Sequence, residues 1–317
     1  MGWVSNANSQ LLLDFETVFK TPPLTPAAIK LPFSTCDLKV DQKPQSSTVL
    51  GSGRHAARPF YGSRSVTGNL TGPVDLVAIG YILKMVFGAP ATTGSDNTYT
   101  HTFKIGSGTP SFLLEKGWPA DNKYYLYSGC KATGFSISFG GHGELRYTVP
   151  IIGAKEEYGS SSYQEPAAID VSRPSMIFHT SDAAASEGGS AIDTLEEISF
   201  NFQNNTIMGF GLAGHGEGTI AGEGTPTIEG RIKGMFDADT IISKGRDHIT
   251  SSLSVTCTAN AHSIAFLSAE LEYSHESPAI QGPGGAYLDL SFVGYYHASE
   301  IASDFHVVLV NSHPSYE

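Results

Sequence analysis

The 317-residue sequence has few charged side chains and no long apolar run. Charged residues make up 16% of it, whereas about a quarter is usual in folded proteins. Charges are depleted in the centres of protein interfaces, so a surface short of charge suggests that neighbouring molecules cover much of it. The longest apolar stretch, residues 73–86, is interrupted by Asp75, Gly80 and Lys84 and is too short to cross a bilayer.

Cysteine is also scarce, with only Cys36, Cys130 and Cys257. The three are odd in number, stand far apart and form no Cys-x-x-Cys pair, so we expect small, buried, reduced thiols. The N-terminal segment has no basic stretch followed by an apolar core, which argues against a signal peptide. These absences favour a protein that is made in the cytoplasm and does not insert into a membrane.

Positive charge is the third deficit, since the formal net charge is −12. No basic stripe is available to grip phosphates, which excludes tight nucleic-acid binding. Two interpretations of the acidity stay open. It can simply keep the protein soluble, or it can repel a polyanion such as DNA from a surface that DNA must pass.

Motifs for nucleotides, metals and catalysis are weak or absent. GFGLAG at 209–214 matches G-x-G-x-x-G, but the glycines that follow it cannot start a helix, so we expect a glycine-rich loop. Gly-His-Gly-Glu occurs twice, with His142 and His215, and no third metal ligand has suitable spacing, so turns are the better interpretation.

No nucleophile or acid–base pair emerges either. The G-x-S-x-G motif is missing, and Cys130 lies between strand patterns. Asp193, Glu196 and Glu197 could form a carboxylate cluster, but nothing ties them to a cleft. We therefore predict no enzyme, no catalytic residue, no cofactor and no metal.

Alternation of apolar and polar residues is the dominant positive signal. In TGFSISF, for example, three apolar side chains fall on one face and two serines on the other. Such runs, bounded by Gly, Pro, Asn and Ser, predict antiparallel strands at 133–139, 144–149, 198–202, 253–257, 287–292 and 306–310. One helix is expected at 75–87, with Asp75 near its start and Gly88 and Pro90 as stop signals.

An internal repeat divides the chain. VTGNLTGPVD at 66–75 and IEGRIKGMFD at 228–237 share the pattern [VI]-x-G-x-[LI]-x-G-x-[VF]-D. A strand and a long loop precede each copy, and a pair of alternating strands ends each half. We predict a first β domain over 1–157 with an N-terminal arm, a linker over 158–192 and a second β domain over 193–317.

Residues 99–157 carry a family resemblance. The segment YTHTFKIGSGTPSFLLEKGW, followed by YYLYSGCKATGFSISFGGHGELRYTVPIIGAKEE, resembles the paired hairpins of the duplicated-domain tail tube proteins of siphophages. The segment from Val66 to Pro90 resembles the family's strand-then-helix unit. The C-terminal strands up to Asn311 resemble its closing strands, although Leu267-Ser268-Ala269 replaces an expected Pro-Asn. The resemblance covers residues 30–313 in order.

The resemblance implies a mainly β fold, with a β-sandwich or half-barrel and a short flanking helix in each half. It implies a structural virion subunit whose rings stack into a hollow tube that carries DNA into the host. Because the chain is duplicated, three copies would close a pseudo-sixfold ring. Implied partners are further copies of the chain, the tape measure protein, the tail terminator and distal tail proteins, with DNA passing unbound.

Within that framework we expect acidic residues to outnumber basic ones on the tube's inner wall. Loops 42–65, with Arg54, Arg58 and Arg64, and 158–191 are candidates for contacts between rings, or else solvated loops. Two alternative functions stay open: the inner tube of a contractile injection system, and a carbohydrate-binding β-sandwich or tail-tip adhesin. The adhesin would need surface aromatics, for which Tyr124, Tyr125, Tyr127, Tyr295 and Tyr296 are available.

Overall fold

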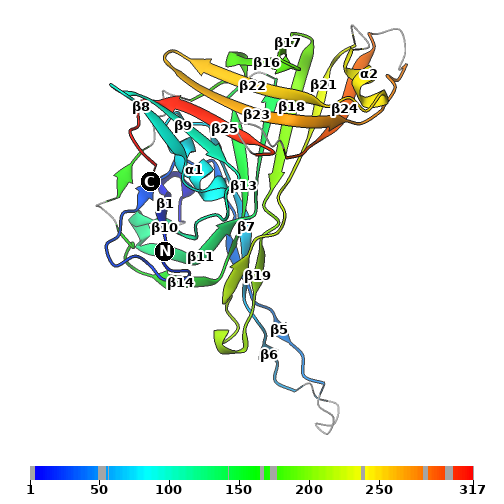
Figure 1. The fold of residues 1–317 in the computed structure, drawn as a ribbon. Helices are drawn as coiled ribbons and strands as arrows, with labels where there is room; N and C mark the ends of the chain where they lie inside the picture. Colours follow the sequence, from blue (N-terminus) through cyan, green and yellow to red (C-terminus); the bar gives the residue numbers. More distant parts are fainter. Residues whose placement is uncertain are drawn as a thin grey trace.

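The computed structural model describes residues 4–48, 55, 57–141, 143–164, 168–171, 177–236, 240–280, 285–296 and 303–316. The fold is mainly β, as predicted, and 21 strands connect into one large mixed sheet that folds over itself (Figure 1). Strands from both halves of the sequence share this sheet. Three parts of it can be followed separately.

The long sheet is antiparallel and runs in the order β3 with β4, then β7, β13, β12, β18, β21 and β24. Its strands span Thr35–Cys36 (β3), Lys39–Asp41 (β4), Ser65–Pro73 (β7), Arg146–Gly153 (β13), Gly134–Gly140 (β12), Leu195–Gln203 (β18), Thr227–Met235 (β21) and Tyr287–Gly294 (β24). The register between β12 and β18 runs from Gly134 opposite Gln203 to Gly140 opposite Glu197. This pairing joins the two halves of the chain.

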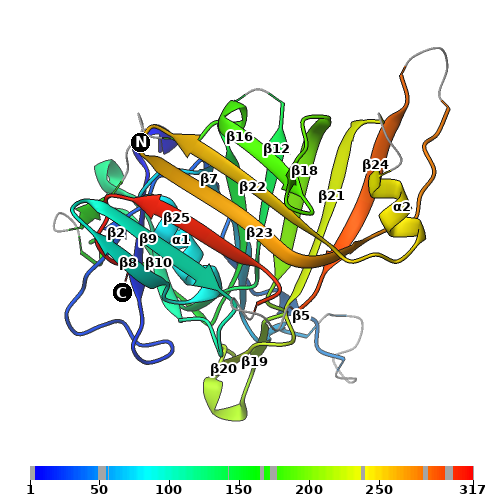
Figure 2. The ribbon, with the colours of Figure 1, turned by 45° about the horizontal axis from the view of Figure 1, so that its top comes forward.

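The covering sheet crosses one face of the long sheet (Figure 2). Its order is β8, β9, β25, β23, β22, β16 and β17. The strands span Ala91–Ser95 (β8), Thr98–Lys104 (β9), His306–Asn311 (β25), His262–Tyr273 (β23), Ser251–Ala259 (β22), Ala183–Glu187 (β16) and Ser190–Ala191 (β17). The last three residues of β23 pair with β24, so the two sheets are continuous there. All six segments predicted from alternation are strands.

A smaller N-terminal sheet packs beside these two. It contains Gln10–Phe15 (β1), Ile29–Lys30 (β2), Phe112–Trp118 (β10), Lys123–Ala132 (β11), Lys155–Gly159 (β14) and Ile169–Asp170 (β15). The pairing of β15 with β2 is parallel, and the other pairs are antiparallel. The predicted linker at 158–192 therefore contributes strands to two sheets, β15 here and β16 and β17 in the covering sheet.

Aromatic side chains fill the space between the long and covering sheets. Phe266 of β23 packs against Phe135 and Phe139 of β12, with ring centroids 6.1 and 5.5 Å apart. Phe305, just before β25, lies 5.3 Å from Phe200 of β18. All five rings are at most 4% exposed. Offset and edge-on ring contacts of this kind add stability beyond the area they bury.

Helix α1 (Ala78–Phe87) confirms the predicted helix and its signals. The Asp75 carboxylate accepts hydrogen bonds from the N–H groups of Val77 (2.9 Å) and Ala78 (3.0 Å), which would otherwise lack partners at the helix start. Gly88, at φ +92°, ends the helix in a conformation that glycine adopts readily. A second helix, α2 (Thr240–Arg246), follows β21 as α1 follows β7. Neither described helix is long and apolar enough to cross a membrane.

Two hairpins project from one end of the long sheet (Figure 1). One contains β5 (Pro44–Gln45) and β6 (Phe60–Tyr61), and the other β19 (Ile207–Gly209) and β20 (Ile220–Gly222). Short 3-10 turns complete the elements at Asn6–Asn8, Pro119–Asp121, Thr180–Asp182 and Leu212–Gly214. Strand β21 starts after the β19–β20 hairpin and leads toward α2, and the hairpins and α2 lie at opposite ends of the molecule (Figure 1).

Candidate assembly surfaces

The face of the long sheet that points away from the core is polar. Alternation places large apolar side chains of each strand under the covering sheet and mainly hydroxyl, amide, charged or proline side chains on the other face. On β18, for example, Phe200 and Phe202 are buried, whereas Asn201 is exposed. The long sheet therefore has the character of a wall with one wet side.

Charges on this wet face are nearly balanced. The acidic members are Asp41, Glu196, Glu197, Glu229 and Asp289, and the basic members are Lys39, Arg146, Arg231 and Lys233. Arg231 donates two hydrogen bonds to the carboxylate of Asp289, at 2.5 and 2.6 Å. Within the strands, five acidic against four basic groups leave an excess of one negative charge, and the exposed Asp37 and Glu144 add to it just beyond the strand ends, so most of the chain's net charge of −12 still lies elsewhere.

The β19–β20 hairpin exposes apolar side chains along its strands and at its tip. Ile207 is 73% exposed, Ile220 65%, and Leu212 fully exposed. Phe210 is 47% exposed, and Phe60 and Tyr61 are exposed on the neighbouring hairpin. Several exposed apolar side chains on a protruding hairpin are typical of protein contact surfaces. The signal for this surface in the sequence was a few apolar residues within a glycine-rich segment. That segment was predicted to be a loop, without a role in contacts.

Two ion-pair clusters fasten this hairpin's strands and loops to the rest of the chain. The Glu217 carboxylate forms a salt bridge with Lys20, with Oε2 2.6 Å from Nζ. Its Oε1 lies 3.6 Å from Nη1 of Arg64. Burial would raise the pKa of Glu217, but the Lys20 hydrogen bond and nearby positive charges outweigh it and lower the pKa. Arg64, in a loop expected either to contact the next ring or to be solvated, has an acidic partner within its own chain. Arg58 is exposed, and Arg54 lies outside the described residues.

The second cluster centres on Glu223. Its carboxylate accepts hydrogen bonds from Lys131 Nζ (2.8 Å), Thr109 Oγ1 (2.6 Å) and the Thr109 backbone N–H (3.0 Å). Burial favours a raised pKa here too, yet the hydrogen bonds from Lys131 and Thr109 hold the pKa of Glu223 below its ordinary value. Glu217 belongs to the second Gly-His-Gly-Glu, which was predicted to be a turn, and Glu223 was not predicted to have a role; neither ion pair is visible in the sequence, because the partners are distant along the chain.

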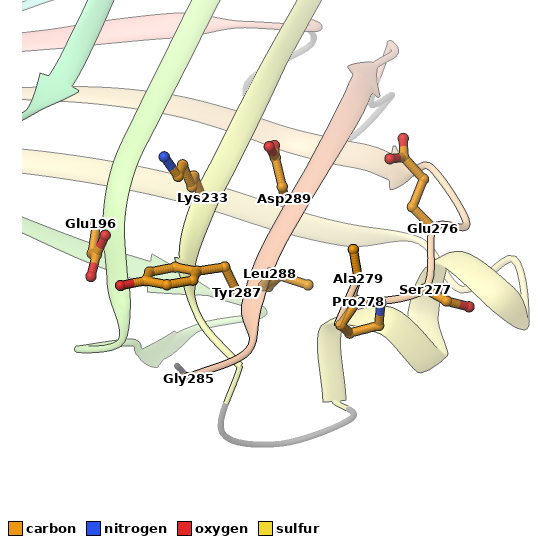
Figure 3. A pocket seen from close by; sticks show the side chains of 10 residues that line it. All are labelled: Glu196, Lys233, Glu276, Ser277, Pro278, Ala279, Gly285, Tyr287, Leu288 and Asp289. Atoms are coloured by element: carbon orange, nitrogen blue, oxygen red, sulfur yellow. The ribbon is translucent and has the colours of Figure 1, made fainter. Parts of the chain in front are cut away.

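A cavity of about 570 Å³ opens beside β24, at the edge of the long sheet (Figure 3). Its lining residues are Glu196, Lys233, Glu276, Ser277, Pro278, Ala279, Gly285, Tyr287, Leu288 and Asp289. Glu196 of the suspected carboxylate cluster is among them, whereas Asp193 is exposed and Glu197 lies in a neighbouring groove. The cavity separates β24 from the segment 276–279, which is not a strand.

The remaining motifs have structural roles. GFGLAG forms the end of β19 and a three-residue 3-10 turn, so it is the predicted loop. His215 lies in a left-handed turn at φ +48°, and His142 lies outside the described residues. Among the described residues no three His, Cys, Asp or Glu side chains cluster as metal ligands do.

The cysteines are free, as predicted, with Cys130 and Cys257 buried and Cys36 half-buried. Burial raises the pKa of the Cys130 thiol well above its ordinary value, which makes it a poor nucleophile. Tyr124 and Tyr127 are also buried, so they offer no stacking surface to a sugar.

Among the described residues, the long sheet has one polar face, and both projecting hairpins carry exposed apolar side chains. The chain belongs to the phage tail tube protein family, whose model matches residues 6–294. A search of curated proteins finds no match to it. The protein is therefore a non-enzymatic structural component of the phage tail, and the family implies its self-assembly into a tube.

Proposed function

We propose that this chain is the major tube protein of a long, non-contractile phage tail. Three copies close a ring with pseudo-sixfold symmetry, and stacked rings enclose the channel through which DNA passes into the host. Each chain supplies two tandem units, built from residues 1–157 and 193–317, with 158–192 between them. The observation that carries the proposal is that both halves repeat one strand order in one register.

The register of the first strand pair supports the duplication. In the pair β4–β7, Val40 lies opposite Val66. In the pair β18–β21, Phe202 lies opposite Ile228. The same difference in residue number separates Val40 from Phe202 and Val66 from Ile228, so both partners of the first pair have counterparts in the second. The same shift carries the start of α1 to the start of α2.

The next strand pair repeats as well. Strand β13 pairs with β7 so that Arg146 lies opposite Pro73, and β24 pairs with β21 so that Tyr287 lies opposite Met235. Both β13 and β24 are eight residues long and end in glycine. A fixed rotation relates the halves in this proposal, and a rotation of one sixth of a turn closes after three chains.

The polar face of the long sheet is the proposed channel wall. Hydroxyl and amide side chains and paired charges bind phosphates weakly, whereas a basic wall would release counterions and hold DNA. The balance of five acidic and four basic groups means that repulsion by an acidic wall, the original expectation, plays a smaller part than the absence of net positive charge.

The two hairpins are the proposed contacts between rings. They leave the same end of the sheet, and the exposed apolar side chains of β6 and of the β19–β20 hairpin would be covered by the facing end of the next ring (Figure 1). Loop 42–65 keeps this role from the sequence analysis. Loop 158–191 is less suited, because its residues Ala183–Glu187 form β16 and are already paired with β22. At the ends of the tube, the tape measure, tail terminator and distal tail proteins would bind.

Negative-stain microscopy of the purified full chain tests the proposal. We expect rings or tubes with a central channel, and a ring mass equal to three chains by native mass spectrometry. A chain that stays monomeric at high concentration would contradict the proposal and favour an isolated sandwich such as a sugar-binding module.

A further inference from the structure

We propose that neighbouring copies join by strand addition, with the segment His275–Ile280 of one copy pairing antiparallel with β3–β4 of the next. This inference rests on the proposed ring and assigns the partner edge and the register within it. The chain's own junction between β12 and β18 is the template.

The template follows from the repeat. Strand β13 corresponds to β24 with its own shift in residue number, which takes Arg146 to Tyr287. The same shift takes Ala132, at the end of β11, to Tyr273, at the end of β23. Within the chain, β11 is followed directly by β12. The counterpart of β12 is therefore the segment that starts at His275 directly after β23. Similarly, β3 and β4 are the counterparts of β18, which is the strand that β12 pairs with.

Both counterparts lack the strand partner that the template provides. Between the described residues, β3 and β4 pair with β7 alone, which leaves their other edge without a strand. The segment 275–280 forms no strand and lies across the cavity from β24 (Figure 3). Extended segments that complete an exposed sheet edge are a common mode of protein association.

Burial at one position points to a missing neighbour. Phe139 of β12 is 4% exposed, packed between the sheets. Its counterpart by the same shift is Ile280, which is 97% exposed. An isoleucine with its whole side chain in water is unfavourable, and the position where the template buries a phenylalanine indicates where Ile280 belongs after assembly.

The backbone hydrogen bonds of the junction fit a specific register. The template places Ile137 opposite Phe200, and the corresponding residues of the junction are Pro278 and Leu38. Proline has no N–H, so it cannot donate to the Leu38 carbonyl. That carbonyl already accepts a hydrogen bond from the Lys116 ammonium.

The direction of the Leu38 backbone supports this match. The Asp37 N–H donates to the Asn69 carbonyl of β7, and backbone groups alternate sides along a strand. Leu38 therefore presents its backbone groups to the free edge, toward the next copy. Pro278 cannot donate a hydrogen bond to the Leu38 carbonyl, and the Lys116 ammonium donates to that carbonyl instead.

Disulfide trapping tests the register. In the proposed junction, Lys39 and Ser277 are directly opposite and form the more closely spaced type of pair, with Cα atoms about 4.5 Å apart. A disulfide spans that distance. The variant Lys39→Cys/Ser277→Cys, in a Cys36→Ser background, should form covalent trimers on oxidation of assembled rings. Mixing the two single-cysteine variants should stop at dimers, because neither chain then carries both ends of the junction.

The matched control is Asp41→Cys/Ser277→Cys, which is two residues out of register and should give at least tenfold less cross-linked product. Equal cross-linking of both pairs, or rings without any cross-link, overturns the junction but leaves the tube assignment intact. Failure of the unmodified chain to form rings overturns both.

Hydrogen exchange on the unmodified protein provides a test that needs no variant. In this register the N–H groups of Glu276 and Ile280 point toward β3–β4, so these two amides should exchange rapidly in the monomer and at least tenfold more slowly in tubes, whereas those of Ser277 and Ala279 should change less. Equal exchange in the two states contradicts strand addition.

Discussion

His306 lies at the start of β25, 3% exposed, and its Nδ1 has no hydrogen-bond partner. Burial lowers the pKa of His306 to about 4, because the imidazolium would lose its hydration. The unfolded chain should bind a proton near pH 6.5, the ordinary value. Protonation between these two values therefore favours unfolding, so the stability that depends on neutral His306 is complete above pH 6.5 and decreases toward pH 4.

We predict that this residue alone makes the folded chain less stable at pH 4 than at pH 7.5, by about 3 kcal/mol. In His306→Leu the free energy of unfolding should fall less over the same range, as measured by urea denaturation of the monomer. The exposed His55 provides the control, since His55→Leu should retain the full pH dependence. The same slope in both variants would show that His306 is not responsible.

At the scale of elements, the β19–β20 hairpin depends on ion pairs rather than on a core of its own. It pairs over three residues, and its tip is exposed. A two-stranded hairpin in water is marginally stable, so it needs support from the body of the protein. The Glu223 cluster supplies this support, with the Lys131 side chain only 12% exposed and the Glu223 side chain 23% exposed.

Glu223→Gln keeps the shape of the side chain and removes its charge, which should lower the free energy of unfolding by about 2 kcal/mol. Hydrogen exchange of residues 207–222 should become faster, because the hairpin loses an anchor. Glu157→Gln is the control, since the Glu157–Lys155 pair is more exposed and such pairs contribute about 0–1 kcal/mol. Similar losses in both variants would rule out a special role for Glu223.

At the scale of the whole molecule, the charge on the wet face of the long sheet determines whether the proposed channel retains DNA. Glu229→Lys changes the charged groups on the strands of the wet face from five acidic and four basic to four acidic and five basic. Because the change repeats in every copy along a tube, we expect variant tubes to retain DNA at low salt and to release it as salt is raised. Unmodified tubes should not retain DNA at physiological salt.

Asp121→Lys serves as the matched control, since it makes the same charge change on the exposed turn between β10 and β11. Sedimentation of tubes with labelled double-stranded DNA over a salt series would measure retention. Equal retention by the two variants would mean that the wet face of the long sheet does not line the channel.

Sequence alone determined the local structure of this protein. Alternation fixed which residues of β12, β18 and β24 turn inward, because side chains of a strand point to opposite faces in turn. Asp75 and Gly88 marked the ends of α1 through hydrogen bonding and backbone conformation, both of which are local properties. The sequence pattern also indicated the repeat, and the resemblance of residues 30–313 to tail tube proteins indicated a structural subunit, in agreement with the family match.

Only the tertiary structure decided which strands meet. Alternation specifies a face and leaves the neighbour open, so the pairing of β12 with β18 and the incorporation of 158–192 into two sheets were not predictable. The same holds for Tyr316, which is fully buried because Gly80 has no side chain: a Cβ there would lie 2.1 Å from the ring. Contacts between residues distant in the chain depend on how the layers close, and no local pattern records that.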